Sequence, residues 1–233
     1  MNIPDKYING EYLKDNPTWD TEDSQWKAEQ ILKIIKRNNL QPKFICEVGC
    51  GAGEILKILQ NKLNDNCEYT GYEISPQAYN ICKEKENNHL KFELKDFLLE
   101  KNKQYDIIML IDLIEHLEDY FTYLRIIKPQ SEYKILHVPL EFFALSALYQ
   151  SFILNQRKKV GHLHYFTKDI VIQTLTDLNY EIVDYFYTPG YSLGHDYGLK
   201  DRLINIPRKY MYPINKDLTV KLFGGYSLMV LVR

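Results

Sequence analysis

The sequence lacks a strong net charge, a cysteine framework and a long hydrophobic run. Its 233 residues carry a formal net charge of −2, so no positive field of the whole molecule attracts nucleic acid. The four cysteines form no CxxC pair and no zinc-ribbon spacing, which fits a reducing cytoplasm. The most apolar run, residues 142–154, is shorter than the roughly 20 residues that cross a bilayer. We expect a cytoplasmic protein with no membrane span and no nucleic-acid partner, in which this run forms a buried helix or a lid.

Internal repeats are also lacking, as is any linker rich in proline, glycine and serine. Short apolar runs alternate instead with segments of helical periodicity, which predicts a mostly parallel sheet with helices on both faces. The expected strands are 44–48, 69–72, 90–94, 105–111, 133–138, 180–186 and 226–232. No helix is predicted between the last two strands, so we expect the final strand to be antiparallel. The whole chain, 1–233, is expected to form one domain.

Three segments have no place in the expected sheet. Residues 141–166 and 190–224 are long for loops of a compact domain, and such segments are usually functional. We expect these two insertions to form a substrate pocket. Residues 1–40 are predicted to be an N-terminal helical segment that covers the site as a lid, with Trp19 and Trp26 facing the ligand. The alternative, that both tryptophans are ordinary core residues, stays open.

A glycine-rich loop follows the first expected strand and reads Glu47-Val48-Gly49-Cys50-Gly51-Ala52-Gly53. Glycines at alternate positions let the chain turn sharply and let a ligand lie against the backbone. The dinucleotide fingerprint GxGxxG would need glycine where Glu54 stands, and no Walker loop GxxxxGK[ST] is present. A loop without lysine and with a leading glutamate suits the ammonium and sulfonium charges of a ligand better than its phosphates.

Acidic residues follow three further expected strands. Glu73 ends the second strand, where a carboxylate can accept hydrogen bonds from both ribose hydroxyls, as in dinucleotide folds. Asp96 and Phe97 follow the third strand and offer a polar partner and an aromatic face for a purine. The segment 112–116 follows the fourth strand. Since ligands bind at the carboxyl ends of strands in open α/β sheets, these groups predict one site; the alternative is that the two aspartates at 96 and 112 only cap helices.

At these residues the sequence resembles the class I S-adenosylmethionine-dependent methyltransferases. The resemblance covers residues 26–138 with motif detail, and the terminal Gly224-Gly225-Tyr226-Ser227-Leu228 more loosely. It implies a Rossmann-like, doubly wound α/β fold whose seven strands have the order 3-2-1-4-5-7-6, with an antiparallel last strand. It also implies S-adenosylmethionine as cofactor and S-adenosylhomocysteine as product. The implied cofactor-binding residues are Glu47, Gly49, Cys50, Gly51, Gly53, Glu73, Ile74, Asp96, Phe97, Asp112, Leu113 and His116.

The sequence indicates the methyl acceptor only by class. It contains neither the [DN]PP[YFW] motif of enzymes that methylate exocyclic base amines nor the Pro-Cys nucleophile of cytosine-C5 enzymes. The segment 161–167 resembles one found in small-molecule methyltransferases before the helix that follows strand five. We therefore expect a small-molecule acceptor such as a sugar, a quinone-like compound or another metabolite. The alternatives are a non-catalytic methyltransferase-like binding module and a nucleotide-dependent oxidoreductase, the latter disfavoured by Glu54.

His162, with His164 as runner-up, is the candidate catalytic residue. A neutral histidine can accept a proton near pH 7, if the acceptor has to lose one. The alternative is a histidine that hydrogen-bonds the backbone and fixes the loop. An HxH pair on a strand places both rings on one face, but no third ligand with suitable spacing is visible, so no metal is expected.

Overall fold

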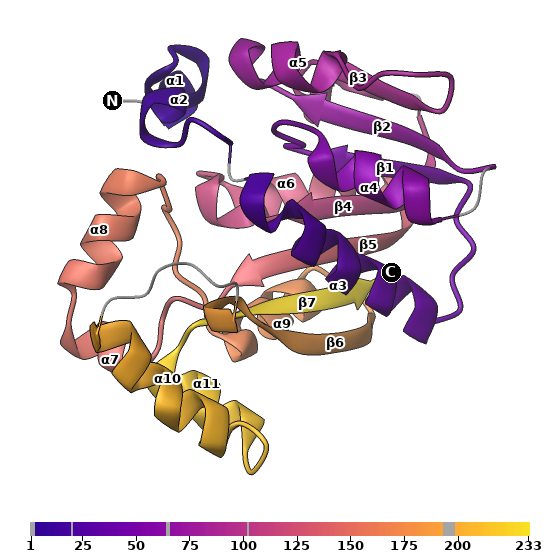
Figure 1. The fold of residues 1–233 in the computed structure, drawn as a ribbon. Coiled ribbons are helices and arrows are strands. Elements are labelled where there is room, and N and C mark those ends of the chain that lie inside the picture. The colour runs from indigo at the N-terminus through magenta and orange to yellow at the C-terminus, as the bar shows by residue number, and fades with distance from the viewer. Residues whose placement is uncertain (1–2, 20, 64–65, 102, 193–198) are drawn as a thin grey trace.

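The computed structural model describes residues 3–19, 21–63, 66–101, 103–192 and 199–233. Its centre is one sheet with the strand order β3-β2-β1-β4-β5-β7-β6 (Figure 1). The strands are β1 (Phe44–Val48), β2 (Glu68–Glu73), β3 (Leu90–Leu94), β4 (Tyr105–Ile111), β5 (Ser131–Pro139), β6 (Ile182–Pro189) and β7 (Tyr226–Val232). Strands β1 to β5 pair in parallel, and β7 is antiparallel to both neighbours, β5 and β6. The predicted fold class and strand order are confirmed.

Helices cover both faces of the sheet. On one face α3 and α4 pack in front of the strands, and on the other face α6 and α9 lie behind them (Figure 1). The helices are α1 (Ile3–Ile8), α2 (Glu11–Asp15), α3 (Ser24–Arg37), α4 (Glu54–Lys62), α5 (Pro76–Lys83), α6 (Tyr120–Ile127), α7 (Ala144–Leu148), α8 (Ser151–Lys159), α9 (Lys168–Asp177), α10 (Leu199–Met211) and α11 (Lys216–Phe223). Short 3₁₀ turns are η1 (Thr21–Asp23), η2 (Phe97–Leu99), η3 (Ile114–His116), η4 (Lys128–Gln130) and η5 (Gly190–Ser192).

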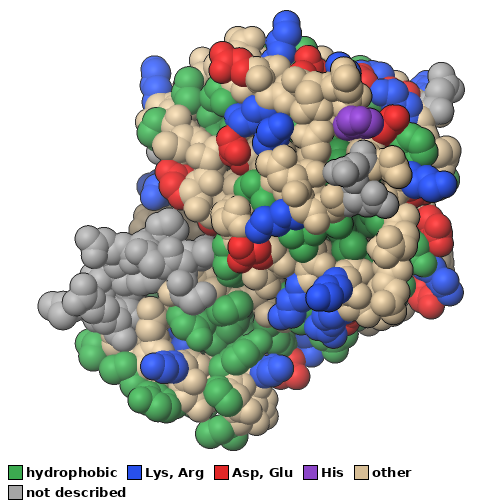
Figure 2. Space-filling model, turned by 45° about the vertical axis from the view of Figure 1, so that its right-hand side comes forward, with side chains coloured by type: hydrophobic (Ala, Val, Ile, Leu, Met, Phe, Trp, Pro, Cys, Tyr) green, Lys and Arg blue, Asp and Glu red, His purple; other side chains and the backbone are tan. Residues whose placement is uncertain are grey.

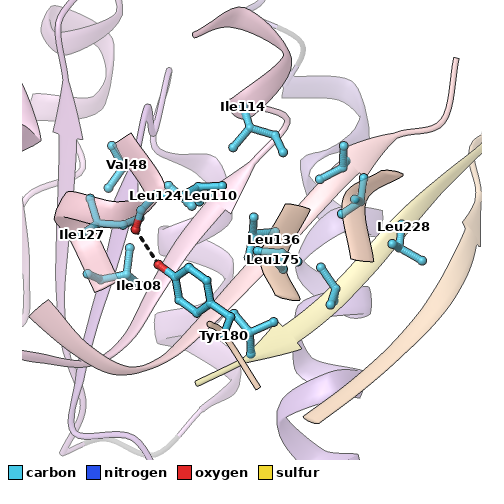
Figure 3. Packing of buried hydrophobic residues seen from close by; sticks show 14 of the residues in the cluster. Val48, Ile108, Leu110, Ile114, Leu124, Ile127, Leu136, Leu175, Tyr180 and Leu228 are labelled. Atoms are coloured by element: carbon cyan, nitrogen blue, oxygen red, sulfur yellow. Dashed lines mark hydrogen bonds between the residues drawn. The ribbon is translucent and has the colours of Figure 1, made fainter. Parts of the chain in front are cut away.

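Strand β4 explains why the central strands lack polar alternation. Its side chains point to opposite faces in turn, so Ile108 and Leu110 join one hydrophobic cluster while Ile107 and Met109 join the other. Both clusters are sealed by helices, and every position from 107 to 111 is therefore apolar and buried. The cluster beneath α6 and α9 is drawn in Figure 3, where the Tyr180 hydroxyl donates to the carbonyl of Leu124 at 2.7 Å.

The segment between β6 and β7 corrects one step of the sequence prediction. It contains α10 and α11, where the sequence pattern predicted no helix. Pro207 lies inside α10, and proline inside a helix removes a backbone donor and weakens the sequence signal. These helices form the lower end of the molecule in Figure 1, and hydrophobic side chains gather at that end in Figure 2. Leu203, Ile206 and Ile214 are among the exposed ones.

The apolar run 142–154 forms neither one buried helix nor a membrane span. It is divided between α7 and the first half of α8, and Leu148, Tyr149 and Leu154 are exposed. No helix in the described part of the chain is long and apolar enough to cross a membrane.

The N-terminal helices lie at the carboxyl edge of the sheet. Gln77, at the start of α5, donates from its side-chain amide to the carbonyl of Ile8 at 3.0 Å. At the other end Lys6 donates to the carbonyl of Lys159, which ends α8, at 2.9 Å. The segment α1–α2 therefore bridges the edge between two elements that are distant in the sequence, as a cover would (Figure 1).

Candidate active site

A cavity of about 580 Å³ opens at the carboxyl edge of the sheet. Five parts of the chain form most of its lining: the loop after β1, the residues that follow β2, those that follow β4, the N-terminal segment from α1 to α3, and the segment 156–162. Strand β1 lies between β2 and β4, so the residues after β2 and those after β4 face each other across the glycine-rich loop. Among the described residues of the expected pocket insertion 190–224, Gly190 is the one that lines the cavity; residues 193–198 lie outside the described part.

The three loop glycines have different surroundings. All adopt left-handed backbone, with φ of +71° at Gly49, +53° at Gly51 and +75° at Gly53. A Cβ atom added at Gly51 would have no atom within 4 Å, so this position opens into the cavity. At Gly53 the same atom would lie 2.6 Å from the ring of Phe92 and 2.8 Å from Cys82. Gly51 thus leaves room for a ligand, whereas Gly53 lets α4 pack closely on the neighbouring elements.

The carboxyl group of Glu47 lies at the start of this loop and lines the cavity. It is 2% exposed, and its Oε2 atom has no hydrogen-bond partner among the described groups. Burial, against the opposing charge of Lys27, raises the pKa of Glu47 to about 8. A buried carboxyl that lacks a partner is costly to keep, and a cation bound in the cavity would satisfy it.

Glu73 is held in place by the backbone. Its Oε2 atom accepts from the N–H of Gly51 at 2.8 Å, and its Oε1 atom accepts from those of Ile74 and Ser75, both at 2.8 Å. Burial raises the pKa of Glu73, and these three hydrogen bonds oppose the rise. A carboxylate has about four acceptor positions, so one position on Oε2 remains for a ligand. To accept hydrogen bonds from both ribose hydroxyls, as predicted, Glu73 would have to use one acceptor position for a hydroxyl and a backbone N–H group together.

Three other predicted cofactor residues border the same space. Ile74 is 42% exposed and lines the cavity beside Glu73. Leu113 lies against the loop, with its Cδ1 atom 3.0 Å from the Cβ position of Gly49. Cys50 lines the cavity, but its buried thiol points inward, 2.7 Å from the Cβ position of Gly71. Cys50 can therefore contact a ligand mainly through its backbone.

Asp96 and Phe97 are not among the described residues that line the cavity. Asp96 is exposed and caps η2, accepting from the N–H of Leu98 at 2.9 Å. Phe97 is 1% exposed, and its ring packs edge-on against Tyr72 at 4.9 Å. The prediction that Phe97 offers an aromatic face to a purine is therefore wrong, because the sheet's core takes the ring. Asp96 caps a helical turn, which agrees with the alternative prediction for this residue.

Asp112 joins a buried polar network that the sequence did not indicate. Its carboxylate binds Lys27 of α3 at 2.8 Å and Nδ1 of His137 on β5 at 2.6 Å. Burial would raise the pKa of Asp112, but His137 and Lys27 outweigh it and hold the pKa below its usual range. Burial would likewise lower the pKa of Lys27, yet Asp112 and Asp23 raise it. Asp112 therefore fixes the cavity wall and caps no helix, and no spacing in the sequence links these residues.

A further polar group of the cavity comes from η3 and from the segment after α8. Glu115, His116 and His162 each offer a ligand atom, and these atoms lie within 4.8 Å of one another. The two imidazole rings are 4.7 Å apart and nearly perpendicular. Burial, with His162 close by, lowers the pKa of His116 to about 3, so its ring is neutral. The structure thus places His116, which was predicted to bind the cofactor, beside His162, which was predicted to be the catalytic base.

Each ring of this group has a partner on its Nδ1 atom. His162 contacts Oε2 of Glu141 at 2.7 Å, and Glu141 in turn accepts from the side chain of Gln156 at 2.6 Å. His116 contacts the hydroxyl of Tyr7 at 2.9 Å. The hypothesis that His162 accepts a proton from the methyl acceptor stays a prediction. The alternative was a histidine that hydrogen-bonds the backbone, but the His162 ring contacts a carboxylate instead.

His164 points away from the cavity. Its Nε2 atom contacts the carbonyl of Leu117 at 2.9 Å, and its ring packs edge-on against Tyr120 at 4.7 Å. It is not among the described residues that line the cavity. The prediction of His164 as the second candidate base is therefore corrected: the segment is irregular rather than a strand, so the two histidines do not share a face.

The cover of the cavity is aromatic and comes from the N-terminal segment. Tyr7, Tyr12, Trp19 and Trp26 all line the cavity, and both tryptophans are half-buried. These positions favour the prediction of ligand-facing tryptophans over the core alternative. None of the described residues from 142 to 154 lines the cavity. The part of the insertion 141–166 that does so is later and consists of Gln156, Val160 and His162.

Known proteins share this sequence pattern and this fold. A family model described as a methyltransferase domain matches residues 23–185. The uncharacterized protein MJ1252 of Methanocaldococcus jannaschii is 34% identical over 82 residues, a match that covers 33% of this chain and 30% of that protein. The chain thus matches less than a third of the length of this curated relative.

Two solved structures illustrate the shared fold. The plantazolicin methyltransferase BpumL in complex with SAH has a TM-score of 0.63 at 16% identity, covering 99% of this chain and 93% of that chain. The magnesium protoporphyrin IX methyltransferase ChlM from Synechocystis PCC 6803 with bound SAH has a TM-score of 0.59 at 14% identity, covering 89% and 82%. At this identity the likeness shows the fold alone. The family model, by contrast, spans well over half of the chain, and on that match the protein belongs to the methyltransferase domain family.

Proposed function

We propose that this methyltransferase transfers the methyl group of S-adenosylmethionine to a small-molecule acceptor. The observation that carries the cofactor assignment is Glu47: a buried carboxyl with an unpartnered oxygen, at the start of a glycine-rich loop whose Gly51 opens into the cavity. S-adenosylmethionine has an ammonium and a sulfonium charge, and either would compensate this carboxyl. Solved methyltransferases of the same fold contain S-adenosylhomocysteine, which supports the assignment.

The cavity fits such a cofactor from the side of β2. Glu73 has an acceptor position left for a ribose hydroxyl, and Ile74 offers an apolar surface next to it. The Gly51 backbone allows close approach from the β1 loop. The adenosine part would therefore lie near β2, and the methyl group would point toward the residues that follow β4 and β5.

The proposed acceptor site lies at that second end, beside His116 and His162. In the transfer the acceptor's lone pair forms the new bond to the methyl carbon, the carbon–sulfur bond breaks, and the electron pair of that bond stays on sulfur. The product thioether is neutral, so the protein's main contributions are alignment and exclusion of water. The aromatic cover from Tyr7 to Trp26 would provide the exclusion.

A small molecule is favoured over a macromolecule as acceptor. The cavity's volume of about 580 Å³ lies within the roughly 300–1,000 Å³ that is typical of small-molecule sites. The net charge of −2 offers no attraction to nucleic acid. A sugar, a quinone-like compound or another metabolite remains the proposed class. A cytoplasmic location is part of the proposal and is supported by four buried cysteines that are all free.

Calorimetric titration tests the cofactor. We expect S-adenosylhomocysteine to bind and NAD not to bind, and we expect Gly51→Val to weaken binding by at least 100-fold because the branched side chain would occupy the ligand's space. Gly51→Ala is the matched control, since it introduces left-handed strain with only a single methyl group and should weaken binding much less. Binding of NAD in preference to S-adenosylhomocysteine would indicate an oxidoreductase. Tight cofactor binding without turnover of any acceptor would instead indicate a binding module.

A further inference from the structure

Glu115 is a fully buried carboxyl group in the wall of the cavity. Its side chain is 0% exposed, yet neither carboxyl oxygen has a hydrogen-bond partner among the described groups. Buried polar atoms are nearly always hydrogen-bonded, and an exception calls for an explanation such as an ion. The side chain lines the cavity, so whatever compensates it can enter from there.

Two imidazole rings face this carboxyl group. The ligand atoms of Glu115, His116 and His162 lie within 4.8 Å of one another, although no hydrogen bond joins any two of the three side chains. The Nδ1 atom of His162 is held by Glu141, and that of His116 by Tyr7. The Nε2 atom of each ring is therefore left without a partner in the described structure. Metal-binding histidines are typically oriented in this way, with the second nitrogen bonded to a carboxylate or another oxygen.

We propose that Glu115, His116 and His162 bind one divalent transition-metal ion. Two imidazole nitrogens and one carboxylate oxygen form a donor set that suits Zn²⁺, Fe²⁺ or Co²⁺, whereas Mg²⁺ and Ca²⁺ prefer oxygen ligands only. Ligands at about 2.0–2.2 Å from one ion lie roughly 3–3.5 Å from each other. Since the three ligand atoms lie within 4.8 Å of one another, they would have to approach by up to roughly 1.3–1.8 Å to complete the site.

The fold assembles this site from segments that the sequence keeps apart. Glu115 and His116 belong to η3 after β4, and His162 follows α8 after the insertion. The N–H groups of Leu163 and His164 donate to the backbone carbonyl of Glu115 at 2.7 and 3.2 Å, which fixes the two segments against each other. This contact places Glu115 and His116 beside His162, and His164 is not one of the three ligands.

A metal-bound His162 cannot also be the free base predicted from the sequence, because both roles use its Nε2 atom. With only three protein ligands, the ion would keep open positions toward the cavity. If the proposed function holds, an oxygen or nitrogen atom of the methyl acceptor would occupy one of them, and the ion would fix the acceptor and lower the pKa of its proton. Binding of the ion itself does not depend on that function.

Cobalt titration tests the site directly. Full-length protein treated with EDTA and dialysed is titrated with Co²⁺, with and without S-adenosylhomocysteine, while the visible absorption of cobalt and the binding heat are followed. We expect one ion per chain, displaced by Zn²⁺. Glu115→Gln and His162→Gln should each weaken Co²⁺ binding by at least 100-fold. The matched controls Glu118→Gln, an exposed carboxylate nearby, and His164→Gln should change it by less than threefold.

Two results would overturn the proposal: no saturable binding below about 1 mM Co²⁺ in either titration, or saturable binding that Glu115→Gln and His162→Gln leave unchanged. In the first case, a protonated amine of the acceptor would become the better explanation for Glu115. Thermal melting is a second measurement of metal binding in case a variant folds poorly. Co²⁺ should raise the Tm of the unmodified protein but not that of the Glu115→Gln variant. S-adenosylhomocysteine affinity is measured separately, so failure of the metal site and failure of the cofactor assignment are distinguishable.

Discussion

Single residues at the ends of β1 and β2 have a structural role besides the ligand-binding role that we propose for them. Glu73 is the clearest example, because the same carboxylate that is predicted to bind ribose accepts three backbone hydrogen bonds from Gly51, Ile74 and Ser75. The loop that carries the glycines is thereby tied to the end of β2. A substitution at such a residue changes stability and affinity together.

For Glu73→Ala we therefore expect two effects. Cofactor affinity should fall by at least tenfold, because a charge-assisted hydrogen bond is worth about 1.5–3 kcal/mol. The ligand-free protein should also melt earlier, since three N–H groups lose their acceptor. Glu68→Ala, at the exposed start of the same strand, is the control and should change neither quantity. Calorimetry and thermal melting measure the two effects, and unchanged affinity would place the ribose elsewhere.

Glu47 predicts a pH dependence of stability. Its pKa is about 8 in the folded protein against an ordinary value of 4.5, so between these values the folded state holds a proton that the unfolded state has lost. Stability then falls as pH rises, by up to about 1.4 kcal/mol per pH unit. Glu47→Gln cannot ionise and should lose less stability than the unmodified protein between pH 5 and pH 8. Urea unfolding at several pH values measures this, and parallel curves would contradict it.

At the scale of elements, a charge network adds to the apolar packing of α3 on the sheet. Lys27 reaches from α3 to Asp112 after β4, and Asp112 binds His137 of β5. We expect Lys27→Met to lower the unfolding free energy by roughly 1.5–3 kcal/mol, because Asp112 loses its cationic partner. Lys36→Met, exposed on the same helix, should have little effect. In a double-mutant cycle with Asp112→Asn the losses should not add, and simple additivity would show that the pair is not coupled.

Ligand binding should order two segments that line the cavity: the N-terminal helices that cover it and the later part of the insertion. The N-terminal helices and the segment 155–162 both line the cavity, whereas residues 142–154 do not. We expect amide hydrogen exchange in 3–19 and 155–162 to slow when S-adenosylhomocysteine is added. Exchange in 142–154 should stay the same and serves as an internal control. If exchange slowed only in 142–154, that segment would be the lid, as the sequence predicted.

At the scale of the whole molecule, periodicity predicted most of the sheet. The seven expected strands correspond to β1 to β7, because a strand that is buried on both faces needs a continuous apolar run and Tyr105–Ile111 has one. The antiparallel β7 was predicted from the wrong premise of no preceding helix, since α10 and α11 intervene. Helix α10 has an amphipathic pattern like that of α3, but it contains Pro207, a residue that usually breaks a helix.

The sequence alone determined the glycine-rich loop and the acids that follow the strands, because local turns and strand ends depend on neighbouring residues. It therefore placed Glu47, Gly51 and Glu73 at one edge of the sheet, where they are found. It could not determine how side chains from distant segments orient. Only the tertiary structure decided that Phe97 packs into the core, that His164 turns away, and that Glu115 faces His116 and His162. Those outcomes depend on the packing of β4, β5 and the insertion against one another, and sequence spacing carries no information about it.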